Sequence, residues 1–235
     1  MRSENFREAF PQICRFTNFH GALITMPHKV AVVDWLGEAS AAVRLAGACN
    51  AVRRSGDGKL IGDMFDGEGF VRGVARTGRN IAGQRVLIVG AGGVGSAIAA
   101  ACAKAGAAEI ALTDTRAGAA ERLANRLRLN YPGLKLSLDS NDPSSFDIAV
   151  NATPLGTYAG DPLPMDPSRL SPSALVGEVV LKPGTTAFLA AAKARGLACV
   201  TGLDMLFEQI PAYLEFFGFP SATAAELRET AEIKN

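Results

Sequence analysis

From about residue 80 onward, the chain alternates short apolar runs with longer stretches of helical periodicity. The apolar runs are typical of strands buried on both faces of a sheet, and they lie at 85–89, 109–113, 135–138, 147–150 and 175–181. Helical patterns separate or follow them at 95–105, 117–129 and 186–195, and Gly196 ends the last of these. Repeated strand–helix units predict a parallel sheet with right-handed crossovers and helices on both faces.

The part before residue 80 has a different pattern. We expect its elements in this order: a short strand in 21–27, a helix at 28–36, a β-hairpin of 48–53 with 59–63, and a helix at 67–77. The end of the chain, at 205–217 and 222–233, is helical and has no strand of its own. We therefore expect the end of the chain to pack on the first part.

Composition and charge exclude several classes of protein. A net charge of +1 gives no concentrated cationic field, so neither a nucleic acid nor a membrane is expected as a partner. Residues 86–103 are uncharged and as long as a membrane span, but four glycines near their start favour a turn between strand and helix. The four cysteines form no CxxC pair, so no metal site is expected. The first residues lack the apolar core of a signal peptide, which predicts a cytoplasmic location.

A glycine-rich turn follows the first apolar run of the second part. Its residues are Gly90, Ala91, Gly92, Gly93, Val94 and Gly95, which give the pattern G-x-G-x-x-G between a strand and a helix. In such a turn the first glycine permits the sharp bend, the second lets the backbone approach a pyrophosphate, and the third lets helix and strand pack closely. The same residues could instead form a turn that serves packing alone. The strand–turn–helix context favours dinucleotide binding.

Asp114 ends the next apolar run, where an acid would accept hydrogen bonds from an adenosine ribose. A carboxylate at this position repels a 2′-phosphate, so we expect NAD as the cofactor, with NADP less favoured. Arg116 is two residues further on and could partly offset this repulsion. Asp114 could instead cap the helix that follows.

Five further segments accompany the glycine-rich turn in a fixed order. They read GALITMPHK at 21–29, GACNAV at 47–52, GDMFDGEGF at 62–70, NATPLG at 151–156 and GLDMLFEQ at 202–209. With these segments the sequence resembles the shikimate/quinate dehydrogenase family from residue 21 to residue 219. The resemblance implies an NAD(P)-dependent dehydrogenase that oxidises a ring hydroxyl of shikimate, quinate or a related cyclic hydroxy acid.

The resemblance also implies roles for individual residues. Lys29 and Asp66 would be the catalytic pair, with substrate contacts from Thr25, Asn50 and Gln209. Besides the glycine-rich turn, Asp114 and Arg116, the cofactor would contact Asn151, Thr153, Pro154, Leu155 and Gly202. The catalytic pair makes chemical sense, because hydride transfer from an alcohol requires the hydroxyl proton to leave, and a carboxylate can hold the lysine that takes it. From spacing alone, Lys29 would be an exposed lysine at a helix start, Asn50 a hairpin residue and Gln209 a solvent-facing residue.

Several departures from the family pattern concern the substrate. Leu23 replaces an asparagine, Met64 and Phe65 replace an Asn-Thr pair, and Leu181 replaces a tyrosine, so apolar residues stand where polar contacts are expected. The family's first strand and its Ser-x-Ser carboxylate-binding segment are absent, so either the chain is a fragment or recognition of a substrate carboxylate is altered. A folate-dependent dehydrogenase of related architecture is disfavoured by Asp66-Gly67 and by the segment ending at Gln209.

Together these observations predict an α/β protein: a Rossmann-type doubly wound parallel sheet with a second, smaller α/β substrate domain. We expect residues 71–205 to bind the dinucleotide, and residues 1–70 together with 206–235 to form the substrate domain. The cleft between them would hold the nicotinamide against a ring hydroxyl. A non-catalytic or altered-substrate NAD-binding paralogue stays open as the alternative, and a homodimer is kept as an option for the assembly.

Overall fold

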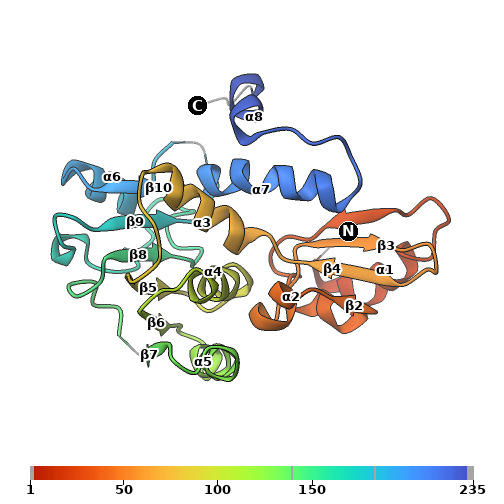
Figure 1. The fold of residues 1–235 in the computed structure, drawn as a ribbon, viewed down its shortest axis with the longest axis horizontal. Coiled ribbons are helices and arrows are strands. Elements are labelled where there is room, and N and C mark those ends of the chain that lie inside the picture. Colours follow the sequence, from red (N-terminus) through yellow and green to blue (C-terminus); the bar gives the residue numbers. More distant parts are fainter. Residues whose placement is uncertain (1–2, 139, 183, 232–235) are drawn as a thin grey trace.

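The computed structural model describes residues 3–138, 140–182 and 184–231. Its larger sheet has six strands: β5 (Arg85–Val89), β6 (Glu109–Thr113), β7 (Lys135–Leu138), β8 (Ile148–Asn151), β9 (Leu175–Glu178) and β10 (Ala198–Val200). They lie in the order β10-β9-β8-β5-β6-β7, and every neighbouring pair is parallel (Figure 1). The predicted Rossmann-type sheet is confirmed. From β5 the chain moves outward to one side, and from β8 to the other, so the sheet has its topological switch point between these two strands.

Helices cover both faces of this sheet. On one face lie α3 (Asp66–Arg76), α4 (Gly93–Lys104) and α5 (Ala119–Asn130), whose apolar side chains form one core with Val86 and Ile88 of β5. On the other face α6 (Ala187–Ala194) and the 3-10 helix η3 (Pro167–Arg169) cover a second core, to which β5 contributes Leu87 and Val89. Alternate residues of one strand therefore enter opposite cores, as the apolar runs predicted.

The smaller sheet comprises β1 (Gly21–Leu23), β2 (Glu38–Ala39), β3 (Ala51–Arg54) and β4 (Leu60–Asp63) in the order β1-β3-β4-β2. β1 with β3 and β3 with β4 are antiparallel, and β2 with β4 is parallel. The predicted hairpin is β3 and β4. The helices of this part are η1 (Ser3–Asn5), α1 (Phe6–Ile13), η2 (Ala31–Trp35) and α2 (Ala41–Ala46), of which η1 and η2 are 3-10 helices.

Several details differ from the predictions. The helix expected at 28–36 is only the 3-10 helix η2, in a segment rich in β-branched valine, which has a lower helix propensity. The last predicted strand ends at Glu178 rather than at residue 181, because the Glu178 carboxylate accepts the Val180 N–H. No counterpart among the predictions exists for the helices α1 and α2, the strands β2 and β10 and the 3-10 helices η1 and η3.

The C-terminal helix α7 (Gly202–Phe216) runs beside α3 and reaches the smaller sheet with its last turn (Figure 1). There the Arg53 guanidinium carbon of β3 lies 5.4 Å from the centre of the Phe216 ring. α8 (Ala224–Thr230) packs on α7 and stands away from both sheets. Residues 232 and 233 of the helix predicted at 222–233 lie outside the described residues.

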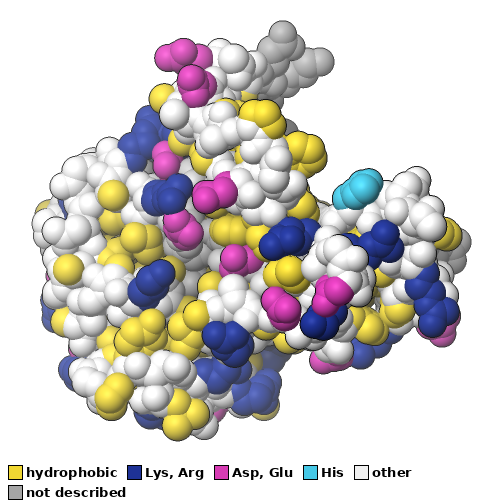
Figure 2. Space-filling model, turned by 45° about the vertical axis from the view of Figure 1, so that its right-hand side comes forward, with side chains coloured by type: hydrophobic (Ala, Val, Ile, Leu, Met, Phe, Trp, Pro, Cys, Tyr) yellow, Lys and Arg dark blue, Asp and Glu magenta, His cyan; other side chains and the backbone are white. Residues whose placement is uncertain are grey.

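Two surface properties bear on partners. Within the described residues, no helix is both long enough and apolar enough to cross a membrane. The face drawn in Figure 2 carries lysine and arginine side chains interspersed with aspartate and glutamate rather than a field of one sign.

Candidate active site

The glycine-rich turn between β5 and α4 is shaped by close backbone contacts. Gly90 has φ +105°, and a Cβ on it would lie 2.8 Å from the Ala152 carbonyl carbon. A Cβ on Gly95 would lie 1.8 Å from the Gly90 carbonyl oxygen. Gly92 differs, because the nearest atom to a Cβ there would be Arg116 Nη2 at 3.6 Å. Protein atoms thus pack closely against Gly90 and Gly95, whereas the space beside Gly92 is open. This space leaves room for a phosphate beside the N-terminus of α4.

The loop after β8 lies against this turn at the switch point of the sheet. Asn151, whose exposed fraction is 0%, holds the loop by hydrogen bonds from its buried side chain. Its Oδ1 accepts hydrogen bonds from Thr153 N at 3.0 Å and Thr153 Oγ1 at 2.6 Å, and its Nδ2 donates to Leu155 O at 2.9 Å. Pro154 is exposed at the tip, and Gly202 begins α7 next to the end of β9. The predicted cofactor residues of β8 and α7 are therefore near one another, although Asn151 itself is buried.

A buried acid that the sequence analysis did not identify supports this loop. Glu178, at the end of β9, is 1% exposed and accepts hydrogen bonds from Asn151 Nδ2 at 2.9 Å, Thr186 Oγ1 at 3.1 Å and Val180 N at 3.2 Å. Burial raises the pKa of its carboxyl above the ordinary value, and the hydrogen bonds partly oppose that shift. The only sequence signal was an acid inside an otherwise apolar run.

Asp114 is held by Arg116, whose backbone N–H donates to Oδ1 at 2.8 Å and whose guanidinium donates two further hydrogen bonds. Arg116 Nε donates to Oδ1 at 2.9 Å and Nη2 to Oδ2 at 2.8 Å, while the Ala91 N–H donates to Oδ2 at 2.7 Å. The guanidinium holds the pKa of Asp114 at about 2. Both carboxylate oxygens are thus engaged, and the exposed guanidinium lies beside the opening at Gly92. The charge that a cofactor would meet at this position is therefore partly neutralised.

Lys29 and Asp66 form an ion pair between the smaller sheet and the glycine-rich turn. Lys29 Nζ donates to Asp66 Oδ2 at 2.5 Å, and the Asp66 residue is 2% exposed. Asp66 is the first residue of α3, where the helix dipole favours an anion. A Cβ on Gly93 would lie 3.1 Å from Lys29 Cβ, so the lysine side chain runs beside the turn. The structure thus brings the predicted catalytic pair together next to the predicted cofactor loop.

Asn50 fixes the other carboxylate oxygen of the pair. Its Nδ2 donates to Asp66 Oδ1 at 2.9 Å, and its Oδ1 accepts the Phe65 N–H at 3.0 Å. The Lys29 carbonyl accepts the Cys49 N–H at 2.7 Å. This backbone hydrogen bond keeps the segment before Asn50 next to Lys29. Lys29, Asn50 and Asp66 therefore form one connected group from three separate segments of the chain.

Gln209 and Tyr213 of α7 extend this hydrogen-bonded group beyond Asn50. Tyr213 Oη accepts from Asn50 Nδ2 at 2.7 Å and donates to Gln209 Oε1 at 3.1 Å. Gln209 was predicted, whereas Tyr213 was not, although a position four residues after Gln209 shares its helix face.

Thr25 is exposed and lines a groove of about 460 Å³ whose other walls are mostly apolar, Leu23 among them. Leu181, the remaining departure, is 55% exposed.

Metal binding has no support in the described ranges, where no three His, Cys, Asp or Glu side chains are grouped so that they could hold an ion. The arrangement instead offers two functions side by side. An open glycine turn at a helix N-terminus can take a dinucleotide phosphate, and a buried lysine–carboxylate pair beside it can exchange a proton.

Comparisons with known proteins indicate the family of this chain. The model of the shikimate dehydrogenase substrate binding domain matches residues 1–52, and that of the ThiF family matches residues 72–116. The chain is 40% identical over 204 residues to shikimate dehydrogenase (NADP(+)) of Rubrobacter xylanophilus, covering 83% of this chain and 70% of that protein. It is 35% identical over 197 residues to the Geobacter metallireducens protein of the same name, covering 80% of this chain and 68% of that protein.

Two solved structures are similar over nearly the whole chain. The 5-ketofructose reductase of a Gluconobacter strain superposes with a TM-score of 0.81 at 32% identity, covering 98% of this chain and 84% of that chain. Shikimate 5-dehydrogenase of Listeria monocytogenes, in complex with shikimate and NAD, gives a TM-score of 0.84 at 26% identity, covering 97% of this chain and 83% of that chain.

The expectation of NAD over NADP is wrong. The curated relatives, the Rubrobacter and Geobacter proteins among them, are named as NADP(+) enzymes. The physical reason lies in Arg116, which occupies both oxygens of Asp114 and places a cation where the sequence pattern suggested a free carboxylate. On this sequence and structural evidence, the chain belongs to the shikimate/quinate dehydrogenase family, whose members are NAD(P)-dependent oxidoreductases that act on CH–OH groups.

Proposed function

We propose that this protein is an NADP-dependent dehydrogenase that reversibly oxidises a ring hydroxyl of shikimate or a related cyclic hydroxy acid. The observation that carries the proposal is the buried Lys29–Asp66 pair directly beside Gly93 of the dinucleotide turn. A bound nicotinamide would supply the hydride acceptor. In the oxidation direction the hydroxyl oxygen gives its proton to the Lys29–Asp66 pair as its carbon loses a hydride, and in the reduction direction the pair returns the proton.

The residues fit the cofactor at two points. The opening at Gly92 lies at the N-terminus of α4, where backbone N–H groups and the helix dipole favour a pyrophosphate. The exposed Arg116 guanidinium lies beside that opening and would pair with a 2′-phosphate, which favours NADP. Asn151 and Glu178 would hold the loop of Thr153, Pro154 and Leu155 against the nicotinamide. In this proposal residues 71–205 are the dinucleotide domain and the rest of the chain is the substrate domain.

A second candidate is the reduction of a neutral keto sugar. It is favoured by the groove beside Thr25, whose walls are mostly apolar and include no lysine or arginine among the residues that the structure describes, and by the likeness to the 5-ketofructose reductase at 32% identity. A substrate carboxylate would need a polar partner there. The chemistry at Lys29 and Asp66 would be the same, so the two candidates differ in the substrate alone. A homodimer and a cytoplasmic location stay predictions.

The test is a spectrophotometric assay of the purified protein with NADP and NAD in parallel. Shikimate, quinate and 5-ketofructose serve as substrates, each in the direction that its oxidation state permits. We expect turnover with a cyclic hydroxy acid and NADP, and its loss in Lys29→Met. Lys104→Met, at the far end of α4, is the matched control and should keep full activity. Turnover of 5-ketofructose alone would favour the second candidate, and binding of NADP without turnover of any compound would contradict both.

A further inference from the structure

The Tyr213 hydroxyl lies between Asn50 and Gln209, the two buried residues that the family resemblance assigns to substrate hydroxyls. It accepts from Asn50 Nδ2 at 2.7 Å and donates to Gln209 Oε1 at 3.1 Å. Tyr213 follows Gln209 by one helical turn on α7, so both side chains leave the same face of the helix. A phenol oxygen therefore sits where a substrate hydroxyl would have to sit to contact both residues.

Asn50 has almost no hydrogen-bonding capacity left for a substrate. Its two amide hydrogens are directed to Asp66 Oδ1 and Tyr213 Oη, and its carbonyl oxygen accepts the Phe65 N–H. A side-chain amide has two donors, so both are used. Asn50 is also 1% exposed. It thus orients Asp66 and Tyr213, and a substrate hydroxyl could take the place of its contact to Tyr213 only if the phenol oxygen were removed.

Gln209 and the surroundings of Tyr213 determine that the Tyr213 hydroxyl donates to Gln209 and accepts from Asn50. Burial, together with the nearby negative charge of Asp66, raises the pKa of the Tyr213 hydroxyl above its ordinary value. The phenol therefore stays protonated, and its hydrogen is directed to Gln209 Oε1, as the hydrogen of an alcohol would be. The ring is held by Phe65, at 5.3 Å between centroids with an 84° interplanar angle. Phe65 is one of the apolar residues that replace the family's polar pair.

We propose that Tyr213 takes the place of a substrate hydroxyl and makes the site specific for cyclic hydroxy acids that carry one ring hydroxyl fewer than shikimate. The proposal rests on the proposed function, because it names the substrate class for the same site. Leu23 and Phe65 fit it, since both are apolar residues at positions where the family pattern has polar ones. Removing a buried hydroxyl from the protein should admit a hydroxyl of the substrate, because unpaired buried polar groups discriminate strongly.

The experiment compares wild type with Tyr213→Phe on matched substrates. These are shikimate and its analogues from which each non-reacting ring hydroxyl has been removed in turn, each assayed with NADP. We expect wild type to prefer one deoxy analogue over shikimate in kcat/KM by at least about tenfold. Tyr213→Phe removes the oxygen between Asn50 and Gln209. The ratio of kcat/KM for shikimate to kcat/KM for the preferred deoxy analogue should therefore rise by at least about tenfold.

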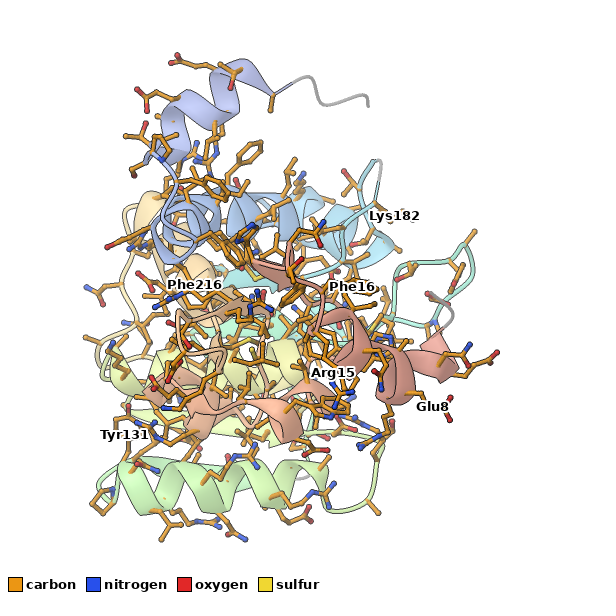
Figure 3. All side chains as sticks on the ribbon, turned by 90° about the vertical axis from the view of Figure 1, so that its right-hand side faces the viewer. Glu8, Arg15, Phe16, Tyr131, Lys182 and Phe216 are labelled. Atoms are coloured by element: carbon orange, nitrogen blue, oxygen red, sulfur yellow. The ribbon has the colours of Figure 1, made fainter. Side chains whose placement is uncertain are left out.

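Tyr131→Phe is the matched control, because it removes a phenol hydroxyl beside the end of α5, well apart from Phe216 in Figure 3. Its substrate ratio should equal that of wild type. A role of Tyr213 in holding Asp66 alone would lower the rates for all substrates together and leave their ratio unchanged. A constant ratio in Tyr213→Phe, or a wild type that prefers shikimate, would therefore overturn the inference.

A binding measurement separates this inference from the proposed function. Calorimetry of the same compounds with the NADP-loaded Lys29→Met variant, with and without Tyr213→Phe, measures discrimination when no turnover occurs. Binding with the expected discrimination, but no turnover in wild type, would contradict the proposed function alone. Equal affinities for shikimate and all analogues in both variants would contradict the inference alone. If none of the compounds binds, both are wrong.

Discussion

Lys29 Nζ donates a hydrogen bond of 2.5 Å to Asp66 Oδ2, and the two residues come from different elements, the segment after β1 and the first turn of α3. The pair is nearly enclosed, with side-chain exposures of 13% and 3%. Asn50 holds the second oxygen of the carboxylate. The orientation of the lysine amine is thus fixed by protein groups before any substrate binds, which is the condition for efficient proton exchange.

Lys29→Ala should therefore lower kcat by about a hundredfold to ten-thousandfold and change KM much less, because proton transfer is needed only in the transition state. Asp66→Asn should affect the same step. Since the two residues act as a unit, the double variant should be little slower than the slower single variant. Steady-state kinetics on the three variants, with circular dichroism as the check of folding, provide the measurement. Additive losses, or a change confined to KM, would argue that another group moves the proton.

Arg116 should decide the choice of cofactor. Arg116→Ala removes the cation beside the opening at Gly92 and the two guanidinium hydrogen bonds to Asp114, while the backbone N–H groups at positions 91 and 116 still donate to the carboxylate. Hydrogen bonds to a charged group contribute about 1.5–3 kcal/mol, which corresponds to a loss of about tenfold to a hundredfold in NADP affinity. The affinity for NAD should stay constant or rise, because a carboxylate no longer paired with a guanidinium can accept from the ribose. Calorimetric titration with both cofactors measures this difference.

Arg128→Ala is the control for cofactor choice, since Arg128 is exposed on α5 and donates to Asn125 Oδ1 of the same helix at 2.9 Å. Its two affinities should match those of wild type. Equal losses for NADP and NAD in Arg116→Ala would mean that Arg116 only supports the turn through Asp114 and Ala91. The preference for NADP would then have to come from another residue.

The larger sheet was predictable because its signals are local. The apolar runs that became β5, β6 and β8 can be buried only in a sheet covered on both faces, and Gly90 and Gly95 mark a turn that no larger residue can form. β10 escaped prediction because it has three residues and follows directly on the stop signal at Gly196.

The site was predictable only where its residues carry a motif. Lys29 and Asp66 lie 37 positions apart, and spacing alone favoured an exposed lysine. Tyr213 and Glu178 carry only weak sequence signals, because their roles depend on Asn50 and Asn151, which come from other parts of the chain. The cofactor was mispredicted for a similar reason: the position of Asp114 is readable from the sequence, whereas the contacts of Arg116 with both its oxygens are not.

Two glycines of the turn should respond differently to the same substitution. Gly92→Val should fold, because Gly92 has φ −76° and a Cβ there meets no atom closer than 3.6 Å. It should nevertheless lose NADP affinity by about a hundredfold, since the side chain fills the space for the pyrophosphate and removes contacts of about 2–3 kcal/mol. Gly95→Val should fail to fold stably, because its Cβ would lie 1.8 Å from the Gly90 carbonyl oxygen. Thermal unfolding and calorimetry distinguish the two, and NADP binding by a folded Gly92→Val would show that the turn serves packing alone.

Glu178 should make the stability of the protein depend on pH in a defined direction. Its folded-state pKa is raised above the ordinary 4.5 by burial, so the folded state binds this proton more tightly than the unfolded chain. The contribution of Glu178 to the free energy of unfolding is therefore largest below the unfolded pKa, and it is lost as the pH rises through the folded pKa. Glu178→Gln keeps the size of the side chain and an acceptor for Asn151 but does not titrate.

The free energy of unfolding of wild type, minus that of Glu178→Gln, should accordingly decrease as the pH is raised from about 4 to about 8. Urea unfolding at several pH values measures both curves, and all other titrating groups cancel in the difference. Glu109→Gln is the comparison, because Glu109 pairs with Lys135 and has a lowered pKa, so its difference curve should rise over the lower part of the same range. Parallel curves for wild type and Glu178→Gln would contradict the raised pKa, and the loop after β8 would then be held by an ordinary ionised carboxylate.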